Sequence, residues 1–228
     1  MDASIVAVGS VPEDGLAGHP CASLFSSPPW LRALARAYGL EIGASVLVRD
    51  GCVRAVIPFA EIDDLRGRRV VSVPFSDYCD PLVEDAADWE RLVEPVLALG
   101  APVRLRCLRN ELPGRDPRFA AAGQALWHGI DLTRPEAGIW AGLSGTARQN
   151  IRRAEREGVV VRASRAVADL RIFHAMHCRL RKRKYRLLAQ PFALFESLHD
   201  ELSPADGLTV LLAELDGAAV AGILLLVW

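Results

Sequence analysis

Two Asp-Gly pairs, each between β-rich runs, constrain the fold of this chain more than any other feature. Asp50-Gly51 lies within residues 44–59 and Asp216-Gly217 within residues 209–228. An Asp-Gly pair between β-rich runs predicts a hairpin, because both central positions of a type I′ turn need a positive φ. We therefore expect two hairpins of the same design, which hints at an internal duplication.

Helices and further strands are expected around these hairpins. Ser26-Ser27-Pro28-Pro29 precedes apolar residues at helical spacing, and Gly39 follows them, which is the pattern of a capped helix. Strands are also predicted at residues 69–74, 103–108, 125–132 and 159–162, and helices at 88–99, 147–157, 166–184 and 192–202. The order is typical of an α/β fold (α+β, with a mixed sheet).

The repeated order divides the chain into a domain of residues 1–133 and a second of residues 134–228. With 228 residues, half of them apolar, the chain is long enough to bury the cores of both. Its last residues, Leu-Leu-Leu-Val-Trp, end within a predicted strand. An unpaired buried strand exposes apolar surface, so we expect the second domain to be incomplete at its C-terminal side.

Charge and cysteine content exclude several classes of protein. The formal net charge is −1, so nothing global attracts the chain to DNA or to an anionic surface, and anion binding has to be local. Five scattered cysteines without a CxxC pair favour reduced thiols. The first twenty residues include Asp2, Glu13 and Asp14 and lack a basic start followed by an apolar run, which argues against a secretory signal. The longest apolar run, residues 218–228, is roughly half of the ~20 residues of a membrane helix, so a cytoplasmic protein without a transmembrane segment is expected.

Residues 143–158 form the most informative segment. At about 100° per residue on a helix, Arg148, Arg152 and Arg156 share one face, and like charges at this spacing repel. Arginine offers a planar fork that matches phosphate or carboxylate, so the face is a candidate anion site. A solvated helix face is the alternative.

A second basic segment, residues 179–186, contains six cations among eight residues. It continues a helical apolar pattern, so its stem is expected to be packed. It is interpreted either as a contact for a phosphorylated or nucleotide-linked substrate or as a solvated helix end stabilised by the macrodipole.

Three other motifs are discounted. His174, His177 and Cys178 lack the remaining ligands of a zinc site, so no metal is expected. The segment around Ser144 lacks the final glycine of GxSxG, and Ser144 is better explained as a helix cap. Neither a dinucleotide fingerprint nor a P-loop is present.

Four segments resemble FemAB-related proteins of the GNAT (acetyltransferase-like) superfamily: residues 75–82, 143–158, 180–192 and 211–225. The resemblance implies tandem GNAT-like domains and an N-acyl or aminoacyltransferase that modifies an amine of a peptidoglycan or other cell-wall precursor, with relatives linked to exopolysaccharide. It implies a phosphorylated acceptor that is lipid- or nucleotide-linked. The donor would be aminoacyl-tRNA or acyl-CoA, with tRNA as a candidate partner, although the phosphate loop of CoA-dependent domains is not visible.

The resemblance also implies site residues. Asp77 is the candidate for orienting or deprotonating the amine, with a carboxylate that only caps a loop as the alternative. The candidate substrate-binding residues are Tyr78, Arg148, Asn150, Arg152, Arg153, Arg156, Lys182, Lys184, Tyr185 and Arg186. The competing functional hypotheses are a non-catalytic anion-binding module and a scaffold in exopolysaccharide or envelope assembly.

Overall fold

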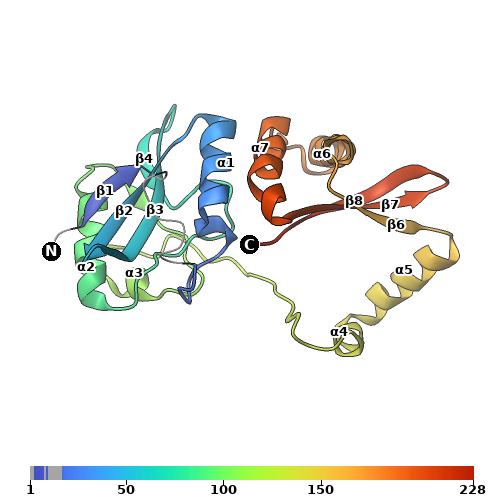
Figure 1. Cartoon of the computed structure of the whole chain (residues 1–228), viewed down its shortest axis with the longest axis horizontal. Coiled ribbons are helices and arrows are strands. Elements are labelled where there is room, and N and C mark those ends of the chain that lie inside the picture. Colours follow the sequence, from blue (N-terminus) through green and yellow to red (C-terminus); the bar gives the residue numbers. More distant parts are fainter. Residues whose placement is uncertain (1–2, 8, 10–16) are drawn as a thin grey trace. The chain divides into compact units, whose positions relative to one another are not determined.

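The computed structural model describes residues 3–7, 9 and 17–228 (Figure 1). The chain divides into two compact units: residues 1–122, 191–207 and 226–228 form unit 1, and residues 123–190 and 208–225 form unit 2. Asp2, Glu13 and Asp14, which carried the argument against a signal sequence, lie outside the described residues.

Unit 1 is built on a five-stranded sheet in the order β1-β2-β3-β4-β5. The strands are β1 (Ser4–Ala7), β2 (Glu41–Arg49), β3 (Cys52–Asp64), β4 (Gly67–Val71) and β5 (Val103–Arg104). Neighbours are antiparallel except β4 and β5, which are parallel. The first predicted hairpin is confirmed, because Asp50 and Gly51 join β2 to β3 with φ of 53° and 76°.

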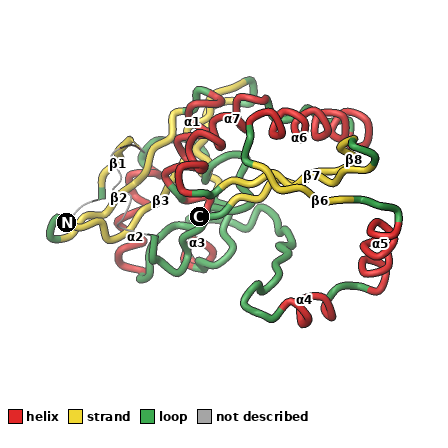
Figure 2. Tube along the Cα trace, turned by 45° about the vertical axis from the view of Figure 1, so that its right-hand side comes forward, coloured by secondary structure: helices red, strands yellow, loops and turns green. Residues whose placement is uncertain are grey.

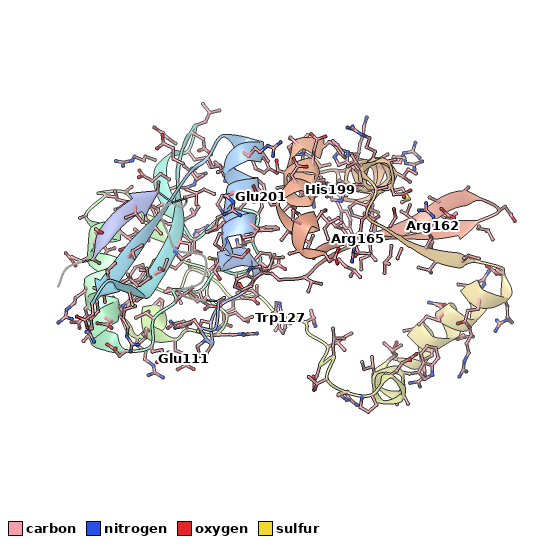
Figure 3. The ribbon with its side chains drawn as sticks, viewed as in Figure 1. Glu111, Trp127, Arg162, Arg165, His199 and Glu201 are labelled. Carbon is pink, nitrogen blue, oxygen red and sulfur yellow. The ribbon has the colours of Figure 1, made fainter. Side chains whose placement is uncertain are left out.

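Helix α1 (Pro28–Tyr38) follows the predicted caps. The Ser27 hydroxyl accepts from the Trp30 N–H at 3.3 Å, and Gly39 ends the helix in the left-handed region. Helix α7 (Phe192–Leu202) also belongs to unit 1, where Arg32 of α1 pairs with Glu201 of α7 at 2.8 Å (Figure 3). A segment late in the sequence therefore completes the first compact unit.

Helix α2 (Ala86–Leu97) covers the sheet of unit 1. It buries Trp89, Leu92, Val93 and Val96 against a cluster that includes Phe59 of β3. The shorter turns of this unit are η2 (Leu24–Ser26), α3 (Leu112–Arg115) and η4 (Ser203–Ala205). Apolar burial against α2 thus supplies much of the core of unit 1.

Unit 2 contains a three-stranded sheet in the order β6-β7-β8. Its elements are α4 (Glu136–Gly142), α5 (Gly145–Arg156), β6 (Val160–Ser164), α6 (Val167–Leu180), the π-helical turn η3 (Arg181–Tyr185), β7 (Leu208–Leu215) and β8 (Ala218–Leu226). Asp216 and Gly217 join β7 to β8 with φ of 52° and 76°, which confirms the second hairpin.

The core of unit 2 is small and lies between α6 and its sheet. Leu170 of α6 is buried, and Leu208, Val210 and Leu212 of β7 are buried as well. A Cβ at Gly222 of β8 would come within 3.2 Å of side chains on α6 and β7. A larger residue at this position would require those side chains to shift by a few tenths of an ångström, so glycine favours the close approach of the helix to the hairpin.

A partly exposed cluster of charged side chains links β6, α6 and β7 of unit 2. Arg162 donates both terminal nitrogens to Asp169 at 2.8 Å and also contacts Glu214 at 3.0 Å (Figure 3). The Asp169 carboxylate additionally accepts from the Ser164 hydroxyl. Bidentate charge-assisted bonds of this kind fix orientation as well as adding stability.

The expected mixed α/β class is confirmed, but several expected elements differ. No strand forms at residues 125–132, where Leu126, Trp127, Ile130 and Leu132 are exposed (Figure 3 labels Trp127). The apolar residues that favoured a strand have no neighbouring strand to pack on, and β propensity depends on such packing. The predicted strand at 103–108 shortens to two residues, and β1 and α4 were not predicted.

The predicted domain boundary between residues 133 and 134, which rests on the repeated order of elements, stays a prediction. The compact units divide the chain differently, because residues 191–207 associate with the first of them.

Candidate functional site

Helix α5 begins at Gly145, two residues before its predicted start and directly after the predicted cap. The Ser144 hydroxyl accepts a hydrogen bond from the Ala147 N–H at 3.1 Å, so Ser144 is the N-cap of this helix, as predicted. No residue of α5 is buried. The helix is therefore an exposed carrier of side chains within unit 2.

Arg148 stabilises the end of the preceding helix. Its Nη1 atom donates to the carbonyl oxygens of Trp140, Ala141 and Leu143 at 3.3, 2.9 and 2.6 Å. The last carbonyls of a helix have no partners within the helix and carry its partial negative charge, which a guanidinium satisfies. The described contacts thus give Arg148 a structural task, and its predicted contact with substrate stays a prediction.

The other arginines of α5 differ in the partners of their side chains. The Arg152 guanidinium lies 5.7 Å from the centre of the Trp140 ring, and Arg153 pairs with Glu157 at 2.7 Å. Arg156 and Asn150 are exposed, and in the described part of the chain neither has a side-chain partner. The three arginines that looked equivalent in sequence therefore differ in the structure. Arg148 caps α4, Arg152 lies over an aromatic ring, and Arg156 has no side-chain partner among the described residues.

The second basic segment starts as α6 and ends differently from the prediction. Helix α6 stops at Leu180, and η3 continues it as a π-helical turn that ends at Arg186, whose φ is 52°. Such wide turns are rare and occur often at functional sites. Lys182, Lys184, Tyr185 and Arg186 are all exposed, with the Lys184 ammonium 5.4 Å from the centre of the Tyr185 ring.

The two basic segments do not form one patch. Both views show α5 and α6 on opposite sides of the β6-β7-β8 strands (Figures 1 and 2). Each segment therefore has to be considered as a separate surface of unit 2.

Asp77 and Tyr78 lie in the segment of unit 1 between β4 and α2. The Asp77 carboxylate is exposed, and no hydrogen bond or ion pair holds it among the described residues. Tyr78 is buried, with its ring edge-on to Phe25 at 5.3 Å between centroids. Asp77 thus remains available to a ligand, whereas the ring of Tyr78 mainly contributes packing.

Two residues of this segment have an unusual backbone. Val73 and Phe75, on either side of Pro74, have φ of 29° and 61°, which is rare for β-branched and bulky residues. Conformations of this kind persist where the surroundings hold them, and they cluster at functional sites. The strain supports the segment before Asp77 as part of a site.

Polar contacts hold residues 72–76 in this conformation, and the sequence did not predict these contacts. Arg106 donates its backbone N–H to Ser72 Oγ and its side chain to the Ser76 carbonyl, both at 2.7 Å. Ser76 Oγ also accepts from Trp30 Nε1 at 2.9 Å. The partners lie 30 to 46 residues apart in sequence, so no local pattern could have revealed them.

Asp80 anchors the same segment to the chain that follows β5. Its Oδ1 atom accepts from the backbone N–H groups of Leu108, Arg109 and Asn110 at 2.9, 3.1 and 3.0 Å, and the residue is fully buried. The only signal in the sequence was an acid within a resemblance segment. Asp80 therefore supports the loop that presents Asp77.

The N-terminus of α2 does not suit a phosphate in unit 1. Asp85 caps the helix and accepts from the Asp88 N–H at 2.8 Å. The buried Asp88 carboxylate lies 3.6 to 3.8 Å from three arginines: Arg49, Arg54 and Arg91. Two carboxylates occupy the place where helix geometry would otherwise favour an anion.

In residues 3–7, 9 and 17–228, no three His, Cys, Asp or Glu side chains gather in a way that could hold a metal ion. His174 and His177 instead contact Gln190 through its backbone and side-chain oxygens, at 3.0 and 2.8 Å. His174 and His177, which were discounted as metal ligands, thus hold the end of the loop that follows η3.

Comparisons with known proteins bear on the family and on the fold. Residues 143–228 match a family model described as "Acetyltransferase (GNAT) domain". Among solved structures, "Crystal structure of FemX" is similar with a TM-score of 0.61 and 15% identity, over 95% of this chain and 58% of that chain. The comparison with curated proteins gives no match.

The expected resemblance to FemAB-like proteins of the GNAT superfamily is confirmed for the fold, and residues 143–228 carry its acetyltransferase signature. The chain spans less than two thirds of the length of the FemX structure. In the described part of the chain, no helix combines the length and the apolar character needed to cross a bilayer.

Proposed function

We propose that this chain belongs to an acyltransferase that moves an aminoacyl or acyl group onto an amine of a cell-envelope precursor. The observation that carries the proposal is the acetyltransferase signature of residues 143–228, within a chain that shares the fold of FemX over 95% of its length. Fold alone does not define a reaction, so the exposed residues of the two units supply the chemical argument.

The reaction needs a neutral amine next to an activated ester or thioester. The amine nitrogen attacks the acyl carbon, the alcohol or thiol leaves, and the nitrogen loses one proton. Holding the reactants together can account for much of the acceleration. In the proposed reaction, Asp77, whose carboxylate is exposed and has no partner among the described residues, accepts an N–H of the amine and takes that proton.

A phosphorylated acceptor fits the free cation of α5. Arg156 has no acidic partner in the described residues, whereas Arg153 is paired with Glu157. Arg152 and Asn150 of the same helix are further candidates for this group, whereas the exposed η3 side chains, Lys182, Lys184, Tyr185 and Arg186, are candidates for a separate anionic group. A guanidinium binds phosphate through two parallel N–H bonds, which fixes the orientation of the acceptor.

The acidic start of α2 argues against a CoA pyrophosphate at that helix end of unit 1, and aminoacyl-tRNA is the donor that we propose first. Asp85 and Asp88 occupy the helix N-terminus that could otherwise hold a pyrophosphate. The precursor is proposed to be lipid- or nucleotide-linked, and exopolysaccharide precursors belong to the same chemical class. A cytoplasmic location is proposed together with these substrates.

The test is a transfer assay with the full chain, radiolabelled aminoacyl-tRNA or acyl-CoA, and a lipid-linked or nucleotide-linked amine. We expect transfer from one donor, a kcat reduced at least tenfold by Asp77→Asn, and a KM raised about tenfold by Arg156→Gln with little change in kcat. Arg115→Gln, on unit 1 far from Asp77 in sequence, is the charge-matched control. Absence of transfer from both donors to all acceptors would contradict the proposal.

A non-catalytic anion-binding module or scaffold is the second candidate. It is favoured by the exposed cations of η3, which bind anions without needing a reaction. This candidate predicts affinity for an anionic polymer that falls steeply with salt. Catalytic turnover that Asp77→Asn abolishes while polymer binding stays unchanged would exclude it.

A further inference from the structure

The turn η3 and the residues after it combine cations with exposed leucines. Tyr185, Leu187 and Leu188 expose 50%, 54% and 92% of their surface. We call residues 179–188 the basic loop surface. Exposed leucines that are adjacent in sequence and next to an exposed aromatic ring indicate a surface that meets another apolar phase or molecule.

The charge of this surface is of one sign. No acidic residue occurs between Asp169 and Glu196, although acids and bases nearly balance over the whole chain. The basic loop surface carries the cations Arg179, Arg181, Lys182, Arg183, Lys184 and Arg186. In the described part of the chain, none of these six forms an ion pair. A partner with many negative charges therefore fits it.

The loop is held in place by its own hydrogen bonds. The Leu187 N–H donates to the Arg181 carbonyl at 3.1 Å, and Arg181 Nε donates to the Leu188 carbonyl at 3.2 Å. Gln190 is fixed by His174 and His177. Both leucines thus stay outward while one backbone polar group of each is satisfied internally, which lowers the cost of entering an apolar medium.

We propose that the basic loop surface docks on an anionic lipid bilayer. Leu187 and Leu188 enter the boundary between headgroups and acyl chains, and Tyr185 lies at headgroup level, where aromatic rings with a polar end are favoured. The surrounding lysines and arginines bind the lipid phosphates. The attachment is to the surface of the membrane, not across it.

RNA accounts for part of this surface only. Phosphates would engage the cations, and a base could stack on Tyr185. Neither interaction uses two adjacent aliphatic side chains, of which Leu188 is almost fully exposed. The leucines therefore favour a lipid surface over a polynucleotide. The proposal depends on this surface alone, so it stands or fails separately from the transfer reaction.

Vesicle co-sedimentation of the full chain tests the proposal. Binding is expected with vesicles of phosphatidylglycerol and phosphatidylcholine, and little binding with phosphatidylcholine alone. Lys182→Gln/Lys184→Gln should weaken binding at least tenfold, because each cation adds to the attraction of an anionic surface. The charge-matched control is Arg66→Gln/Arg115→Gln, which removes two exposed arginines of unit 1.

The leucines have a matched control as well. Leu187→Ser/Leu188→Ser should weaken binding at least tenfold, whereas Leu65→Ser, at a fully exposed leucine in the β3–β4 turn, should change it less than twofold. Circular dichroism establishes that each variant is folded. Equal losses in test and control variants would overturn the proposal. Binding to a tRNA-sized RNA that ignores the leucine changes, together with no vesicle binding, would replace it with an RNA surface.

A footprint on the lysines gives an independent measurement. Lys182 and Lys184 are the only two lysines of the chain, so an amine-acetylating reagent reports on this surface and on the N-terminal amine alone. Anionic vesicles should slow acetylation of both lysines several-fold, with the N-terminus as internal reference. Unchanged acetylation in the presence of anionic vesicles would contradict docking through this surface.

Discussion

The two compact units use their charged residues differently. Unit 1 directs them inward: Asp80 and Asp88 are buried, and Asp116 accepts from Trp89 Nε1 at 2.8 Å while pairing with Arg118 at 2.7 Å. Unit 2 has an ion cluster around the partly exposed Arg162, and it leaves Arg156, Lys182, Arg183 and Lys184 exposed. The difference indicates that charge in unit 1 mainly builds structure, whereas charge in unit 2 is available to a ligand.

The largest stability effect is expected at Asp80. Asp80→Ala removes the acceptor of three backbone N–H groups in unit 1, and each buried donor left without a partner costs roughly 1–3 kcal/mol. We expect a loss of about 3 kcal/mol or more in the free energy of unfolding, measured by urea denaturation.

Asp77 provides the control for this experiment, since it is only three residues away. Asp77→Ala should change stability by less than about 0.5 kcal/mol, as surface substitutions usually do. An equal loss of stability in Asp77→Ala and Asp80→Ala would contradict the distinction between Asp80, which supports the loop, and Asp77, which the loop exposes.

Acid should weaken both units over the same pH range. Hydrogen bonds from Arg118 and from Arg162 lower the pKa of Asp116 and of Asp169, respectively, to about 2. Because the folded-state pKa lies below the ordinary value of 3.8, each contribution is complete above that value and is lost as pH falls towards 2.

Substitution by asparagine sharpens this comparison. Asp116→Asn should lower the stability of unit 1 at pH 7, and Asp169→Asn that of unit 2, with the difference from the unsubstituted chain disappearing near pH 2. Hydrogen exchange with mass spectrometry separates the two units. An effect of equal size at pH 7 and pH 2 would contradict the assigned cause.

A smaller effect is expected at Arg148. Arg148→Ala removes a guanidinium from the last carbonyls of α4 and should destabilise that helix by about 1 kcal/mol. Faster amide exchange in residues 136–142 is the measurement. Arg148→Lys should recover part of the protection, because one cation can still reach those carbonyls.

The smallest stability effect is expected at Arg156, in the same helix. Arg156→Ala should leave the free energy of unfolding unchanged within about 0.5 kcal/mol, since no described residue depends on this side chain. Thermal denaturation checks this. A loss comparable to that of Arg148→Ala would show that Arg156 also serves structure, and the contrast within α5 would disappear.

Short-range features could be predicted from the sequence. The Ser27 and Gly39 caps, both Asp-Gly hairpins and the Ser144 cap involve groups within a few residues of one another, so their geometry follows from local backbone and hydrogen-bonding rules. The cationic character of residues 148–156 and 179–186 was likewise visible, because charge is a property of the residues themselves.

Tertiary structure alone decided which of these residues are free. Arg148 and Arg156 look equivalent in sequence, yet only the folded chain brings the carbonyls of α4 to Arg148. Asp77 and Asp80 also look alike, yet one is exposed and the other meets amides about 30 residues away. Burial and pairing depend on contacts between distant segments, which local periodicity does not encode.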